Sequence, residues 1–166
     1  RWGRDVSERK LRSNLLSCLM VDRNDNVWIG YYDRGIDIIE AKTGAIKRFE
    51  PDDQHDWSRM NITKLIMHPG GRILIGTGSD GLLMYDPLTN QINQSLPRIS
   101  DRGLLSSNVT DITVCKEGIT LIGCWGGGIS LYDKRFNRFQ LYRKGSEGLH
   151  GNSVTCFSED DKGFIW

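Results

Sequence analysis

Apolar and polar residues alternate in short blocks along this chain, and glycine, asparagine or aspartate separates one block from the next. Alternation with a period of two is typical of β-strands that bury one face, and the separating residues are those that tight turns require. No stretch shows the helical period of about 3.6 residues. The pattern therefore predicts an all-β chain of short strands joined by tight turns.

The blocks recur as a repeat, and three segments align without a gap. They span residues 19–49, 65–95 and 112–142. One glycine position runs through all three: Gly30, Gly76 and Gly123. The spacing of these glycines gives a repeat of 46 and then 47 residues. A fourth copy begins at Phe157 with FSEDDKGFIW and reaches Trp166, which aligns with Trp28.

Each repeat contains the pattern of four strands. The first strand carries two apolar residues three positions apart, as in Leu16 and Leu19. The turn after it holds Gly71, Gly118, Gly163 or Asp25. Glycine and aspartate both suit the positive φ of a tight hairpin. A G-x-x-x-x-G motif separates the second strand from the third, and the turn before the fourth strand holds Gly44, Asn90 or Asn137.

Four short strands in a repeat of this length are the signature of a β-propeller blade. One small sheet cannot bury both of its faces alone, so blades become stable by stacking around a common axis. We expect three blades, at residues 11–56, 57–103 and 104–148. Residues 149–166 are expected to form the first two strands of a truncated fourth blade, and residues 1–10 the tail of a preceding one.

The predicted fold class is therefore an all-β β-propeller fragment of about three and a third four-stranded blades. The segments VWIGYYDRGIDIIEAKTGAIKRF and LIGCWGGGISLYDKRFNRFQLY make a family resemblance specific. They resemble two-component regulator propeller repeats, with the pattern N-x-V-x-x-I-x-x-D-x-x-G-x-L-W-I-G-T-x-x-G-G-L-x-x-Y-D-x-x-x-G-x-F-x-x-Y, over about residues 11–166. The chain departs from this pattern at Asp25, Leu74, Leu121, Arg34 and Asp80. Asp25 replaces the turn glycine, the two leucines replace Trp, and the last two replace the first glycine of the G-G pair.

The resemblance implies a piece of a seven-bladed propeller in the periplasmic sensor region of a bacterial hybrid two-component histidine kinase. It implies a location on the periplasmic side of the inner membrane and recognition of an oligosaccharide, or another small polar ligand, in signal transduction and gene regulation. The sequence shows no phosphoacceptor histidine in a helical context and no ATP-binding motif. This chain is therefore expected to be neither an enzyme nor dependent on a cofactor.

The balance of charge argues against two classes of partner. The chain has 22 Lys+Arg and 21 Asp+Glu residues, so no net field favours nucleic acid or an anionic membrane. No apolar run is long enough to span a bilayer, and RWGRDVSERK is too polar for a signal peptide. We expect no nucleic-acid or membrane contact, and we expect neighbouring blades or a second chain as protein partners.

The predicted binding surface is the end of the propeller that carries the loops after the second strands and the long loops between blades. Long polar loops on a rigid scaffold commonly bind ligands. Seven residues are candidates there: Tyr31, Tyr32, Arg34, Trp57, Asp80, Trp125 and Arg143. Aromatic faces cover the apolar C–H patches of a sugar, and polar groups bind its hydroxyls. The alternative is that an aromatic residue in a blade loop packs against the neighbouring blade.

Other motifs are predicted to be structural. Asp22, Asn24, Asp25 and Asn26 have calcium-ligand chemistry, but they lie at a hairpin and lack the glutamate that ends a calcium loop, which favours a turn. His55, His68 and His150 have no paired ligand, and the sequons at Asn61 and Asn108 are expected to cap turns. Gly126, Gly127 and Gly128 precede a strand, so they are not a phosphate loop. The cysteines Cys18, Cys115, Cys124 and Cys156 lack metal spacing and are expected to be half-buried thiols.

Two further functions remain open at this point. One is a protein-interaction scaffold of the WD-repeat type, and the other is a propeller lyase, which needs an acid, base or metal cluster over the central channel. About three blades cannot close a ring, because natural propellers have at least four. For each apolar side chain that stays uncovered on an exposed end face, the fold forgoes roughly 1.5–3 kcal/mol of stabilisation from burial. We therefore expect marginal stability for the isolated chain unless chains pair or other blades are present.

Overall fold

Three antiparallel four-stranded sheets make up the computed structural model, which describes residues 10–94, 104, 106–133, 138–145 and 149–166. The first sheet contains β1 (Leu16–Val21), β2 (Val27–Tyr31), β3 (Ile36–Ile39) and β4 (Ile46–Arg48). The second contains β5 (Ile62–Met67), β6 (Ile73–Thr77), β7 (Leu82–Asp86) and β8 (Gln91–Gln94). The third contains β9 (Val109–Val114), β10 (Thr120–Cys124), β11 (Gly128–Asp133) and β12 (Arg138–Tyr142). We call these sheets blades 1, 2 and 3.

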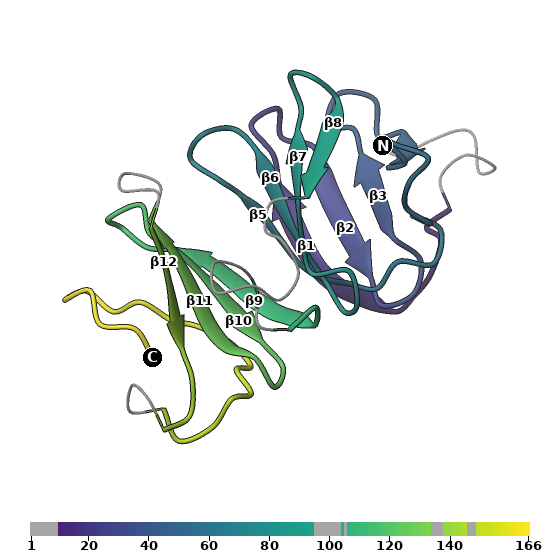
Figure 1. Ribbon diagram of the computed structural model, residues 1–166. Helices are drawn as coiled ribbons and strands as arrows, with labels where there is room; N and C mark the ends of the chain where they lie inside the picture. The colour runs from purple at the N-terminus through teal and green to yellow at the C-terminus, as the bar shows by residue number, and fades with distance from the viewer. Residues whose placement is uncertain (1–9, 95–103, 105, 134–137, 146–148) are drawn as a thin grey trace.

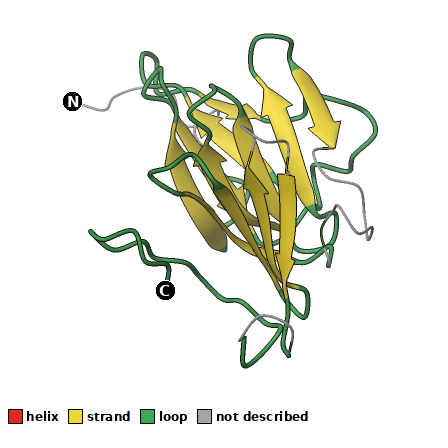
Figure 2. Ribbon diagram, turned by 60° about the vertical axis from the view of Figure 1, so that its left-hand side comes forward, coloured by secondary structure: helices red, strands yellow, loops and turns green. Residues whose placement is uncertain are grey.

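Each blade has its strands in the order of the chain, so the first strand forms one edge and the fourth strand the other. The first strands of successive blades contact one another, β1 with β5 and β5 with β9. Figure 1 shows the blades side by side in chain order, and Figure 2 shows the strands and the loops that join them from a second direction. This arrangement, with the first strands innermost, confirms the expected all-β propeller geometry.

The core lies between the blades rather than within one of them. Blades 1 and 2 share a cluster that includes Trp28 and Ile36 from one side and Leu65 and Leu83 from the other. Blades 2 and 3 share a second cluster, which includes Leu74 from blade 2 and Ile122 from blade 3. Since both apolar clusters form across a blade boundary, stacking is what removes these side chains from water.

The first glycine of the G-x-x-x-x-G motif lets the next blade approach closely. A Cβ on Gly30 would lie 2.8 Å from Ile62 Cγ2, and one on Gly76 would lie 3.0 Å from Val109 Cγ1. At Gly123 the corresponding distance to Val154 Cγ1 is 2.7 Å. In every case the neighbour is an apolar residue at the start of the next repeat, so this glycine is required by blade packing.

The last glycine of the motif supplies a backbone hydrogen bond to the next repeat. Gly35, Gly81 and Gly128 have φ values of 65°, 77° and 76°. Their N–H groups donate to the carbonyl oxygens of Met60, Ser107 and Asn152, at 3.0, 2.9 and 2.7 Å. The positive φ, which glycine adopts without strain, turns each N–H toward the neighbouring segment.

The turn residues adopt the backbone conformation that the sequence predicts. Asp25 has a φ of 62°, and the glycines at the same position of the later repeats have φ values of 88°, 82° and 84°. Gly44 and Asn90 are also in the left-handed region. Asn137, the third residue predicted for that turn, lies outside the described residues, as do residues 1–9 of the predicted tail.

The fourth repeat is only partly formed. Ser158 and Trp166 exchange two backbone hydrogen bonds of 3.0 and 2.8 Å, which close a hairpin around Gly163. Residues 154–157, expected to be a strand, do not form one. Instead the Val154 N–H donates to the Cys124 carbonyl at 3.3 Å, and Val154 packs over Gly123. This segment is therefore placed by blade 3 rather than by pairing within its own repeat.

The face of blade 1 that points away from blade 2 is partly open. Leu16 and Leu19 lie on it with 40% and 62% of their surface exposed. The equivalent residues of blade 2, Ile62 and Leu65, are 0% and 3% exposed because blade 1 covers them. The comparison shows which side chains a blade on this face would bury.

Replacing Gly35 with alanine tests the joint between blades 1 and 2. The new Cβ would lie 1.9 Å from the Trp57 carbonyl oxygen, and the residue has a φ of 65°. Gly118 is the matched control, because its φ is 82° and no atom lies within 4 Å of the built Cβ. We expect Gly118→Ala to cost about 1–2 kcal/mol of unfolding free energy, and Gly35→Ala clearly more. Urea denaturation measures both, and equal costs would show that the close contact does not matter.

Candidate functional site

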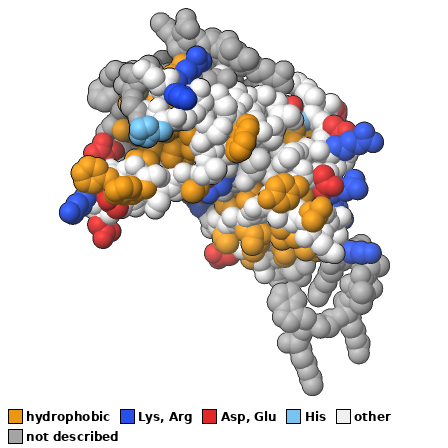
Figure 3. Space-filling model, turned by 90° about the horizontal axis from the view of Figure 1, so that it is seen from below, with side chains coloured by type: hydrophobic (Ala, Val, Ile, Leu, Met, Phe, Trp, Pro, Cys, Tyr) orange, Lys and Arg blue, Asp and Glu red, His pale blue; other side chains and the backbone are white. Residues whose placement is uncertain are grey.

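The strand directions give the propeller two different ends. We call the end with residues 31–35, 77–81 and 124–128 the loop end, because it also carries the segments between blades. The opposite end, with the turns at residues 22–26, 68–72 and 115–119, is the hairpin end. In Figure 1 the loop end is at the bottom, and Figure 3 looks onto it from below and shows hydrophobic side chains exposed in separate patches.

Two of the seven predicted ligand contacts are core residues. Tyr31 is 0% exposed, and its hydroxyl donates to Asp37 Oδ2 at 2.9 Å. Trp57 is 2% exposed, and its ring meets Phe49 edge-on with the centroids 5.0 Å apart. Here the structure corrects the prediction: Trp57 takes the alternative role, packing at a blade boundary, and Tyr31 is buried on the face of blade 1 away from blade 2. Tyr31 lies on the same face of β2 as Ile29 and is buried there beside Asp37. Trp57 belongs to the apolar cluster at the boundary between blades 1 and 2.

Tyr31 belongs to a buried charge network in blade 1. The Asp37 carboxylate is 0% exposed, lies 3.1 Å from Arg12 Nε and also pairs with Arg48. Burial, together with the hydrogen bond to this carboxylate, raises the pKa of Tyr31 far above its ordinary value. Two guanidinium groups balance one carboxylate, which is what makes its burial tolerable. The network fixes residues 10–12 against the blade and holds Tyr31 in the protonated form.

The other five predicted residues are at or near the surface of the loop end. Tyr32 and Trp125 are 56% and 58% exposed. Arg34 and Arg143 are exposed, and Asp80 is half-buried. Tyr32 and Arg34 share one loop of blade 1, Asp80 lies in the equivalent loop of blade 2, and Trp125 in that of blade 3. The structure thus distributes these candidates over three consecutive blades.

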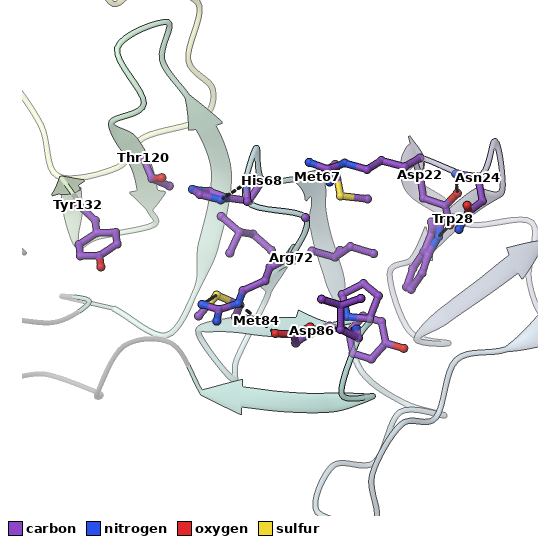
Figure 4. Close-up of a pocket in the computed structure, with 18 residues that line it drawn as sticks. Asp22, Asn24, Trp28, Met67, His68, Arg72, Met84, Asp86, Thr120 and Tyr132 are labelled. Carbon is purple, nitrogen blue, oxygen red and sulfur yellow. Dashed lines mark hydrogen bonds and ion pairs between the residues drawn. The ribbon is translucent and has the colours of Figure 1, made fainter. Parts of the chain in front are cut away.

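A cavity of about 700 Å³ opens at the hairpin end and was not predicted. It extends over the hairpin of blade 2 and reaches both neighbouring blades. Trp28 lines it from blade 1, Met84 and Arg72 from blade 2, and Thr120 and Tyr132 from blade 3. Figure 4 shows these side chains around the opening, with the two blade 3 residues on the far side from blade 1. None of the seven predicted residues lines it.

On the blade 1 side, an ordered turn supports the wall of the cavity. Asp22 accepts hydrogen bonds from the backbone N–H groups of Asn24 and Asn26, at 2.8 and 3.0 Å. Its Oδ2 also accepts the indole N–H of Trp28 at 2.9 Å. Partial burial opposes ionisation, but these hydrogen bonds prevail and lower the pKa of Asp22. The arrangement is the turn that the sequence favours over a calcium loop.

Two arginines give the cavity its positive groups. Arg72 Nε lies 3.3 Å from Asp86 Oδ2, and its Nη1 lies 3.8 Å from the thioether sulfur of Met84. Arg23 donates to the Pro69 carbonyl at 2.6 Å. Asp22 is committed to its own turn, and Asp86 is paired with Arg72. Two arginines and two carboxylates thus line the cavity, and Arg72 is the cation that lies beside the apolar side chain of Met84.

His55 and the cysteines have no geometry of a catalytic or metal site within the described ranges of the chain. His55 Nδ1 lies 2.9 Å from Asp52 Oδ1 within one loop. All four cysteines are free thiols, and burial raises the pKa of Cys124 to about 11. Within the part of the chain that the structure describes, no group of three or more His, Cys, Asp or Glu side chains is placed to hold a metal ion. Nor do the described residues include a helix with the length and hydropathy needed to cross a bilayer.

Solved structures share the architecture. The extracellular domain of the hybrid two-component system BT3049 of B. thetaiotaomicron matches 94% of this chain at a TM-score of 0.76 and 23% identity. The extracellular domain of BT4673 from the same organism matches 98% of this chain at a TM-score of 0.75 and 18% identity. The chain is a run of β-propeller blades. It spans about a fifth of those two domains, 20% of one and 21% of the other.

A lyase is also similar to this chain in fold. Virginiamycin B lyase from Staphylococcus aureus matches 91% of the chain at a TM-score of 0.66 and 14% identity, and the match covers 47% of the lyase. No protein-family model matches the chain, and no curated protein does. At these identities the likeness extends to the fold, and function must be argued from the side chains.

One sequence signal did point toward the cavity. The propeller pattern has Trp at the position of Trp28, and the chain has Leu74 there in blade 2. A smaller side chain in an inter-blade space leaves room, but the size of that room depends on the facing blade. The other lining residues come from strand ends and turns whose sequences carry no binding motif.

The hydrogen bonds of Asp22 predict a dependence of stability on pH. Because its pKa is lowered in the folded state, the stabilisation is present above the ordinary value of 3.8 and is lost as the pH falls below it. We expect Asp22→Asn to be less stable than the parent at neutral pH and to lose less stability on acidification. Urea unfolding at about pH 7 and pH 3 measures this. Asp25→Asn is the control for the loss of one carboxylate from the same turn, because it leaves the hydrogen bonds of Asp22 to Asn24, Asn26 and Trp28 in place.

Proposed function

We propose that this chain is part of an extracellular sensor propeller of a hybrid two-component system. On this proposal the protein lies on the periplasmic side of a bacterial inner membrane, and the signal passes to a histidine kinase elsewhere in the polypeptide. The observation that carries the proposal is the match of 94% and 98% of the chain to two extracellular domains of such systems. The repeat pattern of the sequence supports it independently.

The proposed ligand is an oligosaccharide, bound at the loop end. Trp125 is the strongest candidate contact, because it is 58% exposed and Gly126 beside it adds no side chain to screen the indole. Tyr32 offers a second exposed ring, and Arg34, Asp80 and Arg143 supply polar groups on the same end. Exposed rings beside polar groups are the surface that a sugar requires.

A propeller lyase is the second candidate function, since one such enzyme shares the fold. It is the weaker candidate because the loop-end residues of this chain suggest binding rather than acid–base chemistry. A protein-interaction scaffold is the third. Titration with defined glycans and an assay for glycan cleavage separate the three functions. Binding without cleavage supports a sensor, and cleavage supports a lyase. If the glycans are neither bound nor cleaved, the result supports a protein-interaction scaffold.

Trp125→Ala tests the proposed contact. If the indole covers a sugar ring, its loss should weaken oligosaccharide binding about tenfold, or about 1.4 kcal/mol. Isothermal titration of the chain and of the longer ectodomain with a panel of oligosaccharides measures this. Trp166→Ala is the matched control, because Trp166 is 77% exposed and lies outside the loop end. Equal affinities for the parent and both variants would contradict the assignment of Trp125.

We also propose that another blade, from the same polypeptide or from a second chain, covers the open face of blade 1. The support is the exposure of Leu19, 62%, against 3% for its equivalent Leu65. If a second chain covers the face, light scattering should show a dimer that Leu19→Glu converts to a monomer. Leu88→Glu is the control, since Leu88 is 95% exposed at the hairpin end. A stable monomer of the parent chain would contradict pairing with a second chain.

A further inference from the structure

The boundary between blades 1 and 2 contains an aromatic wedge near the hairpin end. The Trp28 ring lies 4.9 Å from Phe49 and 5.9 Å from Tyr85, measured between ring centroids. Trp28 is 4% exposed, so the two blades cover almost the whole indole. Its N–H is satisfied by Asp22 at 2.9 Å. This boundary shows how the fold fills such a space with a planar ring.

The boundary between blades 2 and 3 lacks this ring. The position of Trp28 is held by Leu74, and that of Tyr85 by Tyr132. Leu74 and Met84 line the cavity from blade 2, and Thr120 and Tyr132 line it from blade 3. Figure 4 shows Thr120 and Tyr132 separated from Met84 across the opening. The repeat therefore lacks the tryptophan ring on the side of the cavity that faces blade 3, and keeps it on the side that faces blade 1.

A cation lies at the rim of this cavity with weak partners. The side chain of Arg72 is 45% exposed. One of its contacts is to the Met84 sulfur at 3.8 Å, and a thioether is a poor acceptor. The other is a single ion pair of 3.3 Å with Asp86, which also accepts the Leu88 N–H at 3.0 Å. A ligand carboxylate can replace the sulfur contact with a shorter, charge-assisted hydrogen bond.

From this geometry we infer a second binding site at the hairpin end, for a planar aromatic ring that carries a carboxylate. The ring takes the place between blades 2 and 3 that the Trp28 indole takes between blades 1 and 2. It packs on Leu74 and Met84 on one side and faces Tyr132 on the other. The carboxylate lies against Arg72. The site is separate from the loop end, so it does not depend on the oligosaccharide proposal.

Titration with indole-3-acetate, with neutral indole as its uncharged counterpart, tests the site. We expect saturable binding of indole-3-acetate, about tenfold tighter than that of indole because of the contact with Arg72. Arg72→Gln should remove this difference while leaving the binding of indole unchanged. Isothermal titration and ligand-observed NMR measure these affinities. Absence of saturable binding, or equal affinity for both probes in the parent chain, would overturn the inference.

Filling the cavity from within the chain is the complementary test. Leu74→Trp restores the ring of the repeat, so it should abolish probe binding and raise the melting temperature by roughly 2–4 °C. Leu121→Trp is the matched control, because Leu121 holds the equivalent position in blade 3 and does not line the cavity. It should leave probe binding intact. Undiminished binding by Leu74→Trp would place the probe elsewhere, and Arg72→Gln gives an independent answer if Leu74→Trp does not fold.

Discussion

The contact between one blade and the next is the interaction on which the rest of this structure depends. A glycine on the second strand, such as Gly30, removes the Cβ that would collide with the next blade, here at Ile62. A second glycine, Gly35, then donates its N–H to the Met60 carbonyl of that blade. The same two contacts recur at both later boundaries. Because the apolar clusters lie between blades, this joint holds the core together as well as the architecture.

The two glycine contacts are the same at each blade boundary, but the space between the blades toward the hairpin end differs from one boundary to the next. Near the hairpin end the blades diverge, and the side chains available there decide whether the space is filled. Trp28 packs against Tyr85 between blades 1 and 2, whereas Leu74 at the equivalent position of blade 2 lines the part of the cavity that reaches blade 3. A repeat protein can thus keep one scaffold and vary its cavities by single residues. The loop end varies similarly, through side chains such as Tyr32 and Trp125 that project from equivalent loops.

The candidate sites were less predictable than the fold. The loop end was predicted from strand direction, and five of its seven proposed residues are at or near the surface. Tyr31 is buried beside the Asp37 carboxylate of β3, on the face of β2 away from blade 2, and the pattern of β2 alone does not show that partner. Trp57 lies in a segment without periodicity, so its direction depends on Phe49 from the preceding blade. The cavity needed the facing blade as well, since Leu74 alone does not show what lies opposite.

Local chemistry was sufficient for the number of strands, the order of the blades and the turns at Asp25 and Asn90. Each of these follows from a period of two or from a positive φ, and both are properties of a few neighbouring residues. Which side chains are buried at the blade boundaries could not be predicted from neighbouring residues alone. Their burial depends on pairs such as Trp28 and Tyr85, which are far apart in the chain and meet only when the blades stack. Only the tertiary structure therefore showed which rings are exposed and where the cavity lies. Packing depends on two surfaces that meet, and the sequence pattern of one strand describes only one of them.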